Sequence, residues 1–292
     1  MRGFLRKMTV AVPETGTSSN SPVQYSLRLD DEALPLNPLM GSEIALTHTG
    51  RIACLECGRA TKKSFSQGYC YPCFKKLAQC DMCIVSPERC HFDAGTCRDE
   101  SFAENFCMQP HIVYLANSSG IKVGITRPAN LPTRWIDQGA VQALPILSVM
   151  TRQQSGLVEV AFKQHISDKT NWQQMLKSQG ETIDLIESRN ALLPQVSQEL
   201  SELTDRFGIQ AVQPILDAEV QRFHYPVTQY PAKVKSHNLD KTPRVEGILE
   251  GIKGQYLILD SGVINLRKFT SYEIEFSAQG SDADPQNQLS LL

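Results

Sequence analysis

The sequence predicts a mixed α+β protein with a cysteine-rich module between short N-terminal β structure and a strand-strand-helix-strand-helix unit. A small β unit follows near the other end. Three observations support this fold class. All nine cysteines lie between residues 54 and 107. Residues 111–167 combine strand-like alternation with helical periodicity, and residues 245–266 contain short apolar runs separated by Gly or Asp-Ser-Gly turns.

Length and composition restrict the class of protein. The 292 residues are enough for two or three compact units of ~100–200 residues each. The net charge of -2 gives no global positive field, so any nucleic-acid surface must be local. We find neither an apolar run of signal-peptide length nor the ~20 apolar residues that span a membrane. We therefore expect a cytoplasmic protein without a membrane partner.

Residues 1–50 form the first predicted unit. Residues 4–12 and 25–29 have the pattern of short strands, and residues 44–47 form another short apolar run. The next segment, residues 51–110, changes character because it holds every cysteine and little apolar periodicity. Such a segment buries little hydrophobic surface and needs another source of stability. The odd cysteine count and the absence of an export signal favour metal ligands over disulfides.

Two pairs of cysteines indicate a metal site. Each pair encloses two residues, and twelve residues separate the pairs. A turn of this kind directs two thiolates at one ion, and a second turn completes a tetrahedron. Gly58 follows the first pair, where a left-handed turn residue is useful. We therefore predict a structural zinc ion bound by Cys54, Cys57, Cys70 and Cys73.

A second group of cysteines follows directly. Cys80 and Cys83 repeat the paired spacing, and a zinc ion needs two further ligands. We predict Cys90 and Cys97, because regular six-residue gaps let a short loop return to the ion. The competing ligands are His91, Cys107 and His111. A redox pair is the alternative, although no thioredoxin-like pattern surrounds these cysteines.

Residues 51–76 carry six basic side chains against one carboxylate, with four aromatic rings between them. Basic groups beside flat rings suit the backbone and bases of a nucleic acid. The alternative is a solvated surface on a small module whose rings form its core. The candidate nucleic-acid-binding residues are Arg59, Lys62, Lys63, Lys75 and Lys76.

A new pattern begins at residue 111. Two short strands flank the turn residues 117–120, and a short helix starts at Thr133 and stops at Gly139. A third strand and an amphipathic helix follow at residues 143–149 and 153–167. The predicted order is therefore strand, strand, helix, strand, helix.

The apolar spacing in residues 182–223 predicts helices. The chain then returns to β structure before a polar tail. The predicted units are an N-terminal β segment (1–50), a cysteine-rich zinc module (51–110), the strand-and-helix unit (111–180), a helical segment (181–224), a C-terminal β unit (225–276) and a disordered tail (277–292).

Residues 111–176 resemble the GIY-YIG nuclease superfamily. The resemblance rests on Tyr114 in one strand, the run from Lys122 to Thr126 in the next, Arg134 in a helix and Glu159 in a later helix. It is closest to the branch whose second motif is Lys-Ile/Val-Gly. His165 and the dipeptide Asn171-Trp172 also match later signals of that branch. The complete chain is similar to an uncharacterised bacterial family that joins a cysteine-rich, zinc-ribbon-like module to such a domain.

The resemblance implies hydrolysis of a phosphodiester with one divalent metal. By position, Tyr114 would be the base or would orient it, and Arg134 would bind the phosphate. Glu159 would hold Mg²⁺. Lys122 takes the place of the second tyrosine, and Asn171 is a weaker match to a polar residue near the end of the motif series.

The chain also departs from the superfamily. The first motif lacks its Gly, and the second lacks its Tyr. Each residue has an ordinary structural alternative: Tyr114 as a packed ring, Arg134 as a solvated helix residue, and Glu159 as the i,i+4 partner of Lys163.

Three functions remain open from the sequence. The first is a Mg²⁺-dependent nuclease steered to DNA or RNA by its zinc modules. The second is a non-catalytic module that binds nucleic acid or the ribosome. The third is a zinc- or thiol-based redox sensor, in which chelation or oxidation switches an output.

Overall fold

The computed structural model describes residues 1–12, 21–166 and 169–279. These described residues form three sheets, and every pairing between named strands is antiparallel. The mixed α+β class predicted from the sequence is confirmed. Most of the predicted tail lies outside the described residues. None of the helices in the described part of the chain is long and apolar enough to cross a membrane.

The largest sheet joins strands from both ends of the chain. Its order is β1-β14-β5-β11-β12-β13. The strands are β1 (Arg2–Phe4), β5 (Glu43–Ile52), β11 (Arg244–Lys253), β12 (Tyr256–Leu259), β13 (Gly262–Asn265) and β14 (Tyr272–Ala278). Strand β5 pairs with both β11 and β14, so residues from the predicted first and fifth units share one sheet. The predicted unit boundaries remain a prediction.

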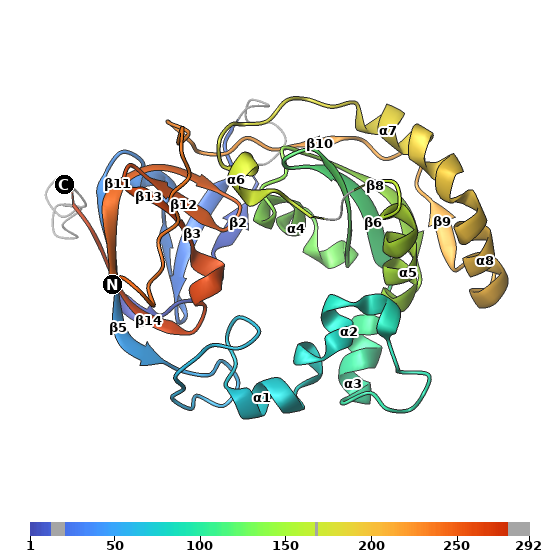
Figure 1. The fold of residues 1–292 in the computed structure, drawn as a ribbon, viewed down its shortest axis with the longest axis horizontal. Helices are drawn as coiled ribbons and strands as arrows, with labels where there is room; N and C mark the ends of the chain where they lie inside the picture. The colour runs from blue at the N-terminus through green and yellow to red at the C-terminus, as the bar shows by residue number, and fades with distance from the viewer. Residues whose placement is uncertain (13–20, 167–168, 280–292) are drawn as a thin grey trace, which may run out of the picture.

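A smaller sheet packs beside this one through a shared hydrophobic core. It consists of β2 (Thr9–Ala11), β3 (Gln24–Leu29) and β4 (Glu32–Pro35). The shared core contains buried side chains of both sheets, and Tyr114 and Trp135 from the middle of the chain join it. Figure 1 shows these strands gathered on the left, where the N-terminus also lies.

The remaining sheet contains the strands predicted after residue 111. Its order is β10-β8-β6-β7, and β9 pairs with β8. The strands are β6 (His111–Asn117), β7 (Ile121–Thr126), β8 (Gln142–Val149), β9 (Val212–Pro214) and β10 (Gln221–Arg222). Strands β6 and β7 form the expected hairpin, in which Tyr114 lies opposite Gly124.

Helices cover one face of this sheet. Two of them follow strands in the order predicted from the sequence. Helix α4 (Thr133–Asp137) lies between β7 and β8, and α5 (Arg152–Phe162) follows β8, so the sequence strand, strand, helix, strand, helix is observed. Apolar side chains of α5 pack with α7 (Leu185–Leu192) and α8 (Ser197–Phe207) on the sheet. Helix α6 (Trp172–Met175) instead reaches the terminal β unit, where Trp172 stacks on Tyr256 with ring centroids 5.7 Å apart.

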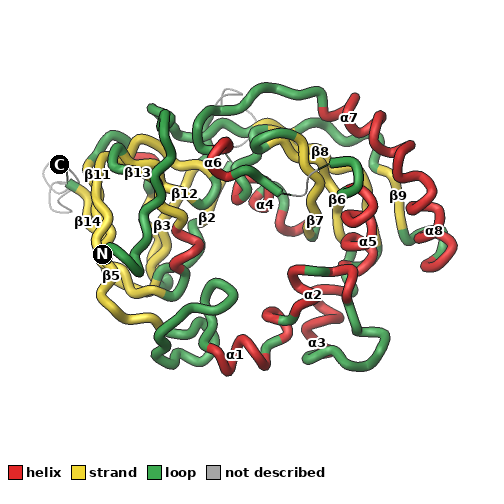
Figure 2. Tube along the Cα trace, in the orientation of Figure 1, coloured by secondary structure: helices red, strands yellow, loops and turns green. Residues whose placement is uncertain are grey.

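The cysteine-rich segment connects the two halves of the molecule. One half consists of the two sheets that contain β1 to β5 and β11 to β14, and the other consists of the sheet of β6 to β10 with its helices. Figure 2 shows that it is mostly loop with short helices. Its helical elements are α1 (Tyr71–Lys76), the 3-10 turn η2 (Ala78–Cys80), α2 (Met82–Val85), the 3-10 turn η3 (Pro87–Arg89), α3 (Glu100–Phe102) and the π-helical turn η4 (Ala103–Cys107). In Figure 1 the sheets that contain the chain ends, the cysteine-rich segment and the unit that contains the β6–β7 hairpin are arranged in a ring.

Candidate metal centre and basic cleft

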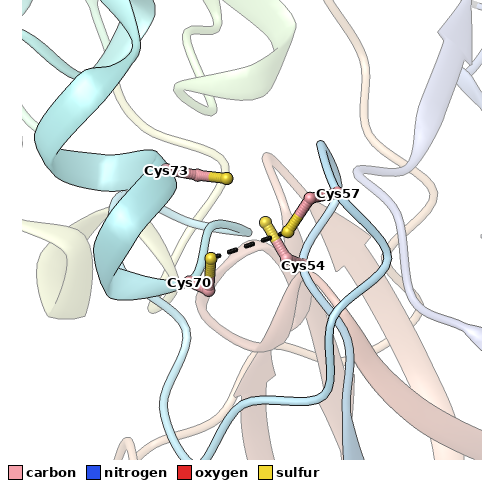
Figure 3. A group of neighbouring side chains, drawn as sticks. All are labelled: Cys54, Cys57, Cys70 and Cys73. Atoms are coloured by element: carbon pink, nitrogen blue, oxygen red, sulfur yellow. Dashed lines mark hydrogen bonds between the residues drawn. The ribbon is translucent and has the colours of Figure 1, made fainter.

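The first four predicted cysteines converge from two elements. Cys54 and Cys57 lie in the turn that follows β5, and Gly58 closes this turn with φ 67°. Cys70 caps the start of α1, and Cys73 lies in its first turn. Figure 3 shows the four thiols facing one another. Two separate turns therefore present the paired ligands predicted from the sequence.

The spacing of these thiols suits a tetrahedral ion. All four sulfur atoms lie within 4.8 Å of one another, and the Sγ atoms of Cys57 and Cys70 are 3.7 Å apart. Zinc–sulfur bonds of ~2.3 Å in a tetrahedron place two sulfur atoms about 3.8 Å apart. Cys54 and Cys70 are buried, so a bound ion would be shielded from water on one side. The group is a candidate metal site compatible with zinc.

The pKa values of Cys54 and Cys73 are shifted in opposite directions. Burial acts to raise the pKa of Cys54, but hydrogen bonding from the backbone at Cys57, Cys70 and Glu56 outweighs burial and lowers the pKa to about 6. Burial and hydrogen bonding with its three neighbours raise the pKa of Cys73. The cluster thus favours a thiolate at Cys54, which is the form that binds a metal.

The aromatic rings of this module pack mainly on one another. Phe65 stacks on Phe74 with centroids 5.6 Å apart and lies 5.5 Å from Tyr71. These contacts fit the alternative in which the rings form the core of a small module. The predicted nucleic-acid-binding residues are all exposed, but none is among the described residues that line the cleft of about 1030 Å³ between the two halves of the molecule: Arg59, Lys62, Lys63, Lys75 and Lys76.

The second cysteine group is divided between two locations. Cys83, Cys90 and Cys97 line one small pocket, together with Cys107, which the sequence left as a competing ligand. Cys80 is not among the described residues that line this pocket. Its thiol is buried, and its pKa is raised by burial, with Ser66 and Arg98 acting in the opposite direction. Cys80 therefore lies outside the pocket that the other three predicted ligands line.

The two competing histidines also separate. Nε2 of His91 lies 3.6 Å from Oδ2 of Asp81, and these two residues form a possible metal group with Cys83. His111 is buried, and its Nδ1 lies 2.7 Å from the carbonyl oxygen of Gln109. Burial lowers the pKa of His111 to about 4, so its ring is neutral at ordinary pH. His111 is not among the described residues that line the pocket.

A cleft of about 1030 Å³ lies between the two halves of the molecule. Its walls come from the N-terminal strands, the cysteine-rich segment, β7, α4, α5 and the 3-10 turn η7 (Leu266–Phe269). The described lining residues include only two acidic side chains, Asp137 and Glu159. The basic ones are Arg6, Lys7, Arg28, Arg127, Arg134, Arg152, Lys163 and Arg267. A strongly positive cleft therefore exists in a chain whose net charge is -2.

Several of these arginines have no carboxylate partner among the described residues. Lys7 pairs with Asp137, Arg6 with Asp30, and Lys163 with Glu159. Within the described residues, no ion pair is formed by the following lining residues: Arg127, Arg134, Arg152 and Arg267.

Elements far apart in the sequence bring these arginines together. Burial lowers the pKa of Arg267, and the positive charge of Arg134 lowers it further, while Asp137 acts in the opposite direction. Arg127 and Arg152 both lie over the ring of Phe106, at 4.1 and 5.6 Å from its centroid. The Nε atoms of these two arginines are buried without a hydrogen-bond partner. These buried Nε atoms are not themselves exposed to the cleft, but they place two positive charges beside it.

Only part of the predicted catalytic set faces the cleft. Arg134 and Glu159 line it, whereas Tyr114, Lys122 and Asn171 are not among the described lining residues. The Nζ of Lys122 donates to Oγ1 of Thr170 at 2.7 Å, and the side chain of Asn171 caps α6. Lys122 therefore contacts Thr170, and Asn171 is the N-cap residue of α6.

Tyr114 lies directly behind the cleft wall. Its ring is fully buried, packs edge-on against Trp135 and donates its hydroxyl to Oε1 of Gln138 at 3.1 Å. Burial raises the pKa of Tyr114, and the charge of Glu159 adds to this rise. The charge and hydrogen bonding of Arg134 act in the opposite direction. The three side chains are therefore close enough to influence one another, but the phenol remains protonated.

The close contact between Gly124 and the ring of Tyr114 explains why the second motif, Lys-Val-Gly, has glycine at this position. A Cβ atom at this position would lie 2.6 Å from both Cζ and the hydroxyl oxygen of Tyr114. We expect Gly124→Ala to destabilise the protein by roughly 1–3 kcal/mol, because the buried ring has no room to move. Urea unfolding measures this change.

The control for this prediction is the same substitution in a Tyr114→Leu background. Leucine lacks the outer ring atoms, so the added cost of Gly124→Ala should fall clearly in that background. An equal cost in both backgrounds would show that the ring contact is not the cause.

Helix α5 holds Glu159 and rests on the cysteine-rich segment. Thr151 is the N-cap of the helix, and its hydroxyl oxygen accepts a hydrogen bond from the backbone N–H of Gln154. The side-chain oxygen of Gln154 accepts in turn from the backbone N–H of Thr151, which completes a capping box. A Cβ atom at Gly156 would lie 2.5 Å from the backbone nitrogen of Glu88 in η3. Sequence reasoning missed this contact, although a glycine inside an amphipathic helix is a signal of close packing.

Comparisons with known proteins place the chain in a family. No curated protein and no solved structure matches it. One family model, described as "Protein of unknown function (DUF2797)", matches residues 41–274, which include the cysteine-rich segment, the hairpin unit and most of the C-terminal β unit. The expectation of an uncharacterised family is confirmed, whereas the GIY-YIG assignment remains a prediction. The chain belongs to the DUF2797 family of proteins of unknown function.

Proposed function

We propose that this protein acts on nucleic acid, and that the basic cleft binds the phosphodiester backbone. The observation that carries the proposal is the lining of the cleft, in which eight basic residues accompany two acidic ones. Phosphate contacts supply most of the sequence-independent affinity for nucleic acid. The volume of about 1030 Å³ leaves room for several nucleotides of a strand.

The kind of cation suits phosphate. Arg127, Arg134, Arg152 and Arg267 each offer a planar guanidinium, and this group binds phosphate oxygens in a bidentate manner. Phe106 and Tyr69 also line the cleft, and aromatic rings beside arginines are a common surface for bases. Because the cations come from both halves of the molecule, a strand in the cleft would contact both halves.

The proposed chemistry is cleavage of a phosphodiester of the GIY-YIG type. Arg134 would stabilise the negative charge that develops on the scissile phosphate. Glu159 lies in the same cleft and would hold Mg²⁺, which supplies Lewis-acid activation of the phosphate. The other lining acid, Asp137, is already bound to Lys7 and to the side-chain amide of Gln255. One carboxylate with substrate phosphates and waters is a normal way to bind Mg²⁺.

Tyr114 takes a supporting role in this proposal. A buried phenol whose pKa is raised is a poor general base at neutral pH. It is well suited to hold Arg134 in place, because the two groups are in hydrogen-bonding contact and Gln138 fixes the hydroxyl. We therefore treat Tyr114 as a positioning residue and not as a catalytic residue.

The test is a panel of single-stranded, duplex and branched DNA and RNA, incubated with the zinc-loaded protein. Cleavage should require added Mg²⁺ or Mn²⁺. Magnesium is omitted in the control and not chelated, because a chelator would also remove zinc. Absence of both binding and cleavage across the panel would contradict the proposal.

Binding should weaken with salt and depend on the cleft. We expect Arg267→Gln to lower affinity and to reduce the slope of log affinity against log salt by about 0.7–0.9. Arg206→Gln, on the exposed face of α8, is the matched control.

The double variant Lys62→Gln/Lys63→Gln tests the rival surface on the zinc module. If this variant weakens binding and Arg267→Gln does not, the cleft is not the binding surface.

A second candidate function is nucleic-acid binding without cleavage. Two observations favour it: Tyr114 lies behind the wall of the cleft, and Lys122 and Asn171 are engaged elsewhere. Such a protein would retain salt-sensitive binding in the cleft, and no member of the panel would be cut at any Mg²⁺ concentration.

A further inference from the structure

We propose a second structural zinc site, formed by Cys83, Cys90, Cys97 and Cys107. These four cysteines line one small pocket between α2, η3, the loop after η3 and η4. Three of them belong to the set predicted from the sequence, but Cys107 replaces Cys80. The inference does not depend on the proposed nucleic-acid function, because it concerns only the metal content and folding of this segment.

The size and lining of the pocket suit one ion. Its free volume is about 10 Å³, which is close to that of a single small sphere. Apart from the four thiols, Asp81 and His91, the lining is apolar: Ala78, Ile84, Phe92, Phe102 and Ala103. Four cysteines of one short segment line this small pocket without forming a disulfide, and four thiolates are the usual ligand set of a tetrahedral structural zinc ion. Among the described residues their sulfur atoms are spaced more widely than those of the first group, so a bound ion would have to draw them together.

Cys80 is excluded by its position. It follows α1 closely, and its thiol is buried beside Ser66 and within electrostatic reach of Cys54, a ligand of the first site. The repeated Cys-x2-Cys spacing of Cys80 and Cys83 therefore does not form a pair. The short helix α2 begins after Cys80 and carries Cys83 into the other pocket.

Asp81 and His91 are weaker ligands here than the thiols. Asp81 already pairs with Nε of Arg98 at 2.6 Å, and a divalent ion at Asp81 would lie close to that guanidinium. Nδ1 of His91 lies 2.8 Å from the hydroxyl of Thr96. Asp81 and His91 place their ligand atoms within 4.8 Å of the Cys83 thiol, but this group contains a single thiol, whereas the pocket lining contains four.

The proposed site would support the cleft indirectly. Gln153 of α5 donates to the carbonyl oxygen of Cys90, and Arg152 donates to that of Ile84. Gly156 of the same helix packs on η3. Zinc binding would hold this segment rigid against α5, which carries Glu159 into the cleft.

Native mass spectrometry of the full chain, purified with zinc, tests the inference. Wild-type protein should carry two zinc ions. Cys107→Ser and Cys90→Ser should each carry one, and Cys80→Ser should retain two. Cys80→Ser is a matched control because Cys80 is buried and belongs to the same segment.

Cobalt-substituted wild-type protein gives a second readout that needs no variant. Its sulfur-to-cobalt charge-transfer band should correspond to four thiolates at each of two sites. The inference is overturned if wild-type protein binds one ion, if Cys80→Ser loses an ion, or if Cys107→Ser retains two. Loss of an ion in His91→Ala would overturn it as well, since that result would assign His91 as a ligand.

Discussion

Arg134→Ala is expected to lower the rate of Mg²⁺-dependent cleavage by about 10²–10³-fold, the usual effect of removing one charge-stabilising donor. Arg134 lines the cleft, lacks a carboxylate partner among the described residues, and lies near Arg267. Its guanidinium is therefore available to a phosphate. Single-turnover cleavage with protein in excess measures the rate separately from substrate affinity.

The matched control is Arg206→Ala on α8, which removes an exposed guanidinium far from the cleft lining. An unchanged rate in Arg134→Ala would exclude this residue from the reaction. If affinity falls and wild-type protein cuts nothing, the binding-only candidate is favoured instead.

Glu159→Gln extends the same prediction to the proposed metal ligand. The substitution preserves size but removes the charge that would bind Mg²⁺, so cleavage should fall at least as much as in Arg134→Ala. Loss of the pair with Lys163 costs only about 0.3–0.5 kcal/mol, which cannot account for such an effect. Glu202→Gln on α8 is the control, and equal unfolding midpoints confirm that both variants are folded.

Removal of zinc from the first site is expected to unfold the segment around it. Structural zinc contributes about 10–16 kcal/mol to the folding of small zinc-dependent modules, which matches or exceeds the whole stability of most domains. The segment from Cys54 to Cys73 has little core beyond the rings of Phe65, Phe74 and Tyr71. Cys54→Ser should therefore lose one ion and its local structure together.

Hydrogen exchange with native mass spectrometry measures this result. Protection should disappear in residues 53–77 and persist in β11, which pairs with β5 within the large sheet. Protection retained in metal-free protein would show that the site is not structural. A reversible change of output on metal removal, with the fold intact, would instead support the sensor hypothesis.

Local features could be predicted well. The spacing of Cys54, Cys57, Cys70 and Cys73 indicated a metal site because each pair of ligands lies on one turn. The order of elements from β6 to α5 followed from hydrophobic periodicity and turn residues. In both cases the signal lies within a few residues, so no knowledge of distant contacts was needed.

The second cysteine group shows that sequence spacing alone does not identify which cysteines lie in one pocket. The repeat at Cys80 and Cys83 suggested a pair, yet the chain turns between them, and the pocket holds Cys107 instead. The exposed lysines of the predicted zinc module were singled out because they are clustered in sequence. The cations that line the cleft are scattered from Arg6 to Arg267, so no window of sequence displays them together.

The sequence by itself determined the α+β class, the four cysteines of the candidate metal site and the succession of strands and helices. Each depends on short-range chemistry: ligand spacing, alternation, turns and caps. Only the tertiary structure decided that the N-terminal and C-terminal strands share a sheet, that Tyr114 is buried behind Arg134, and that arginines from distant elements share one cleft. These features arise because the burial of apolar side chains packs distant segments of the chain against one another. This packing determines which charged side chains become neighbours.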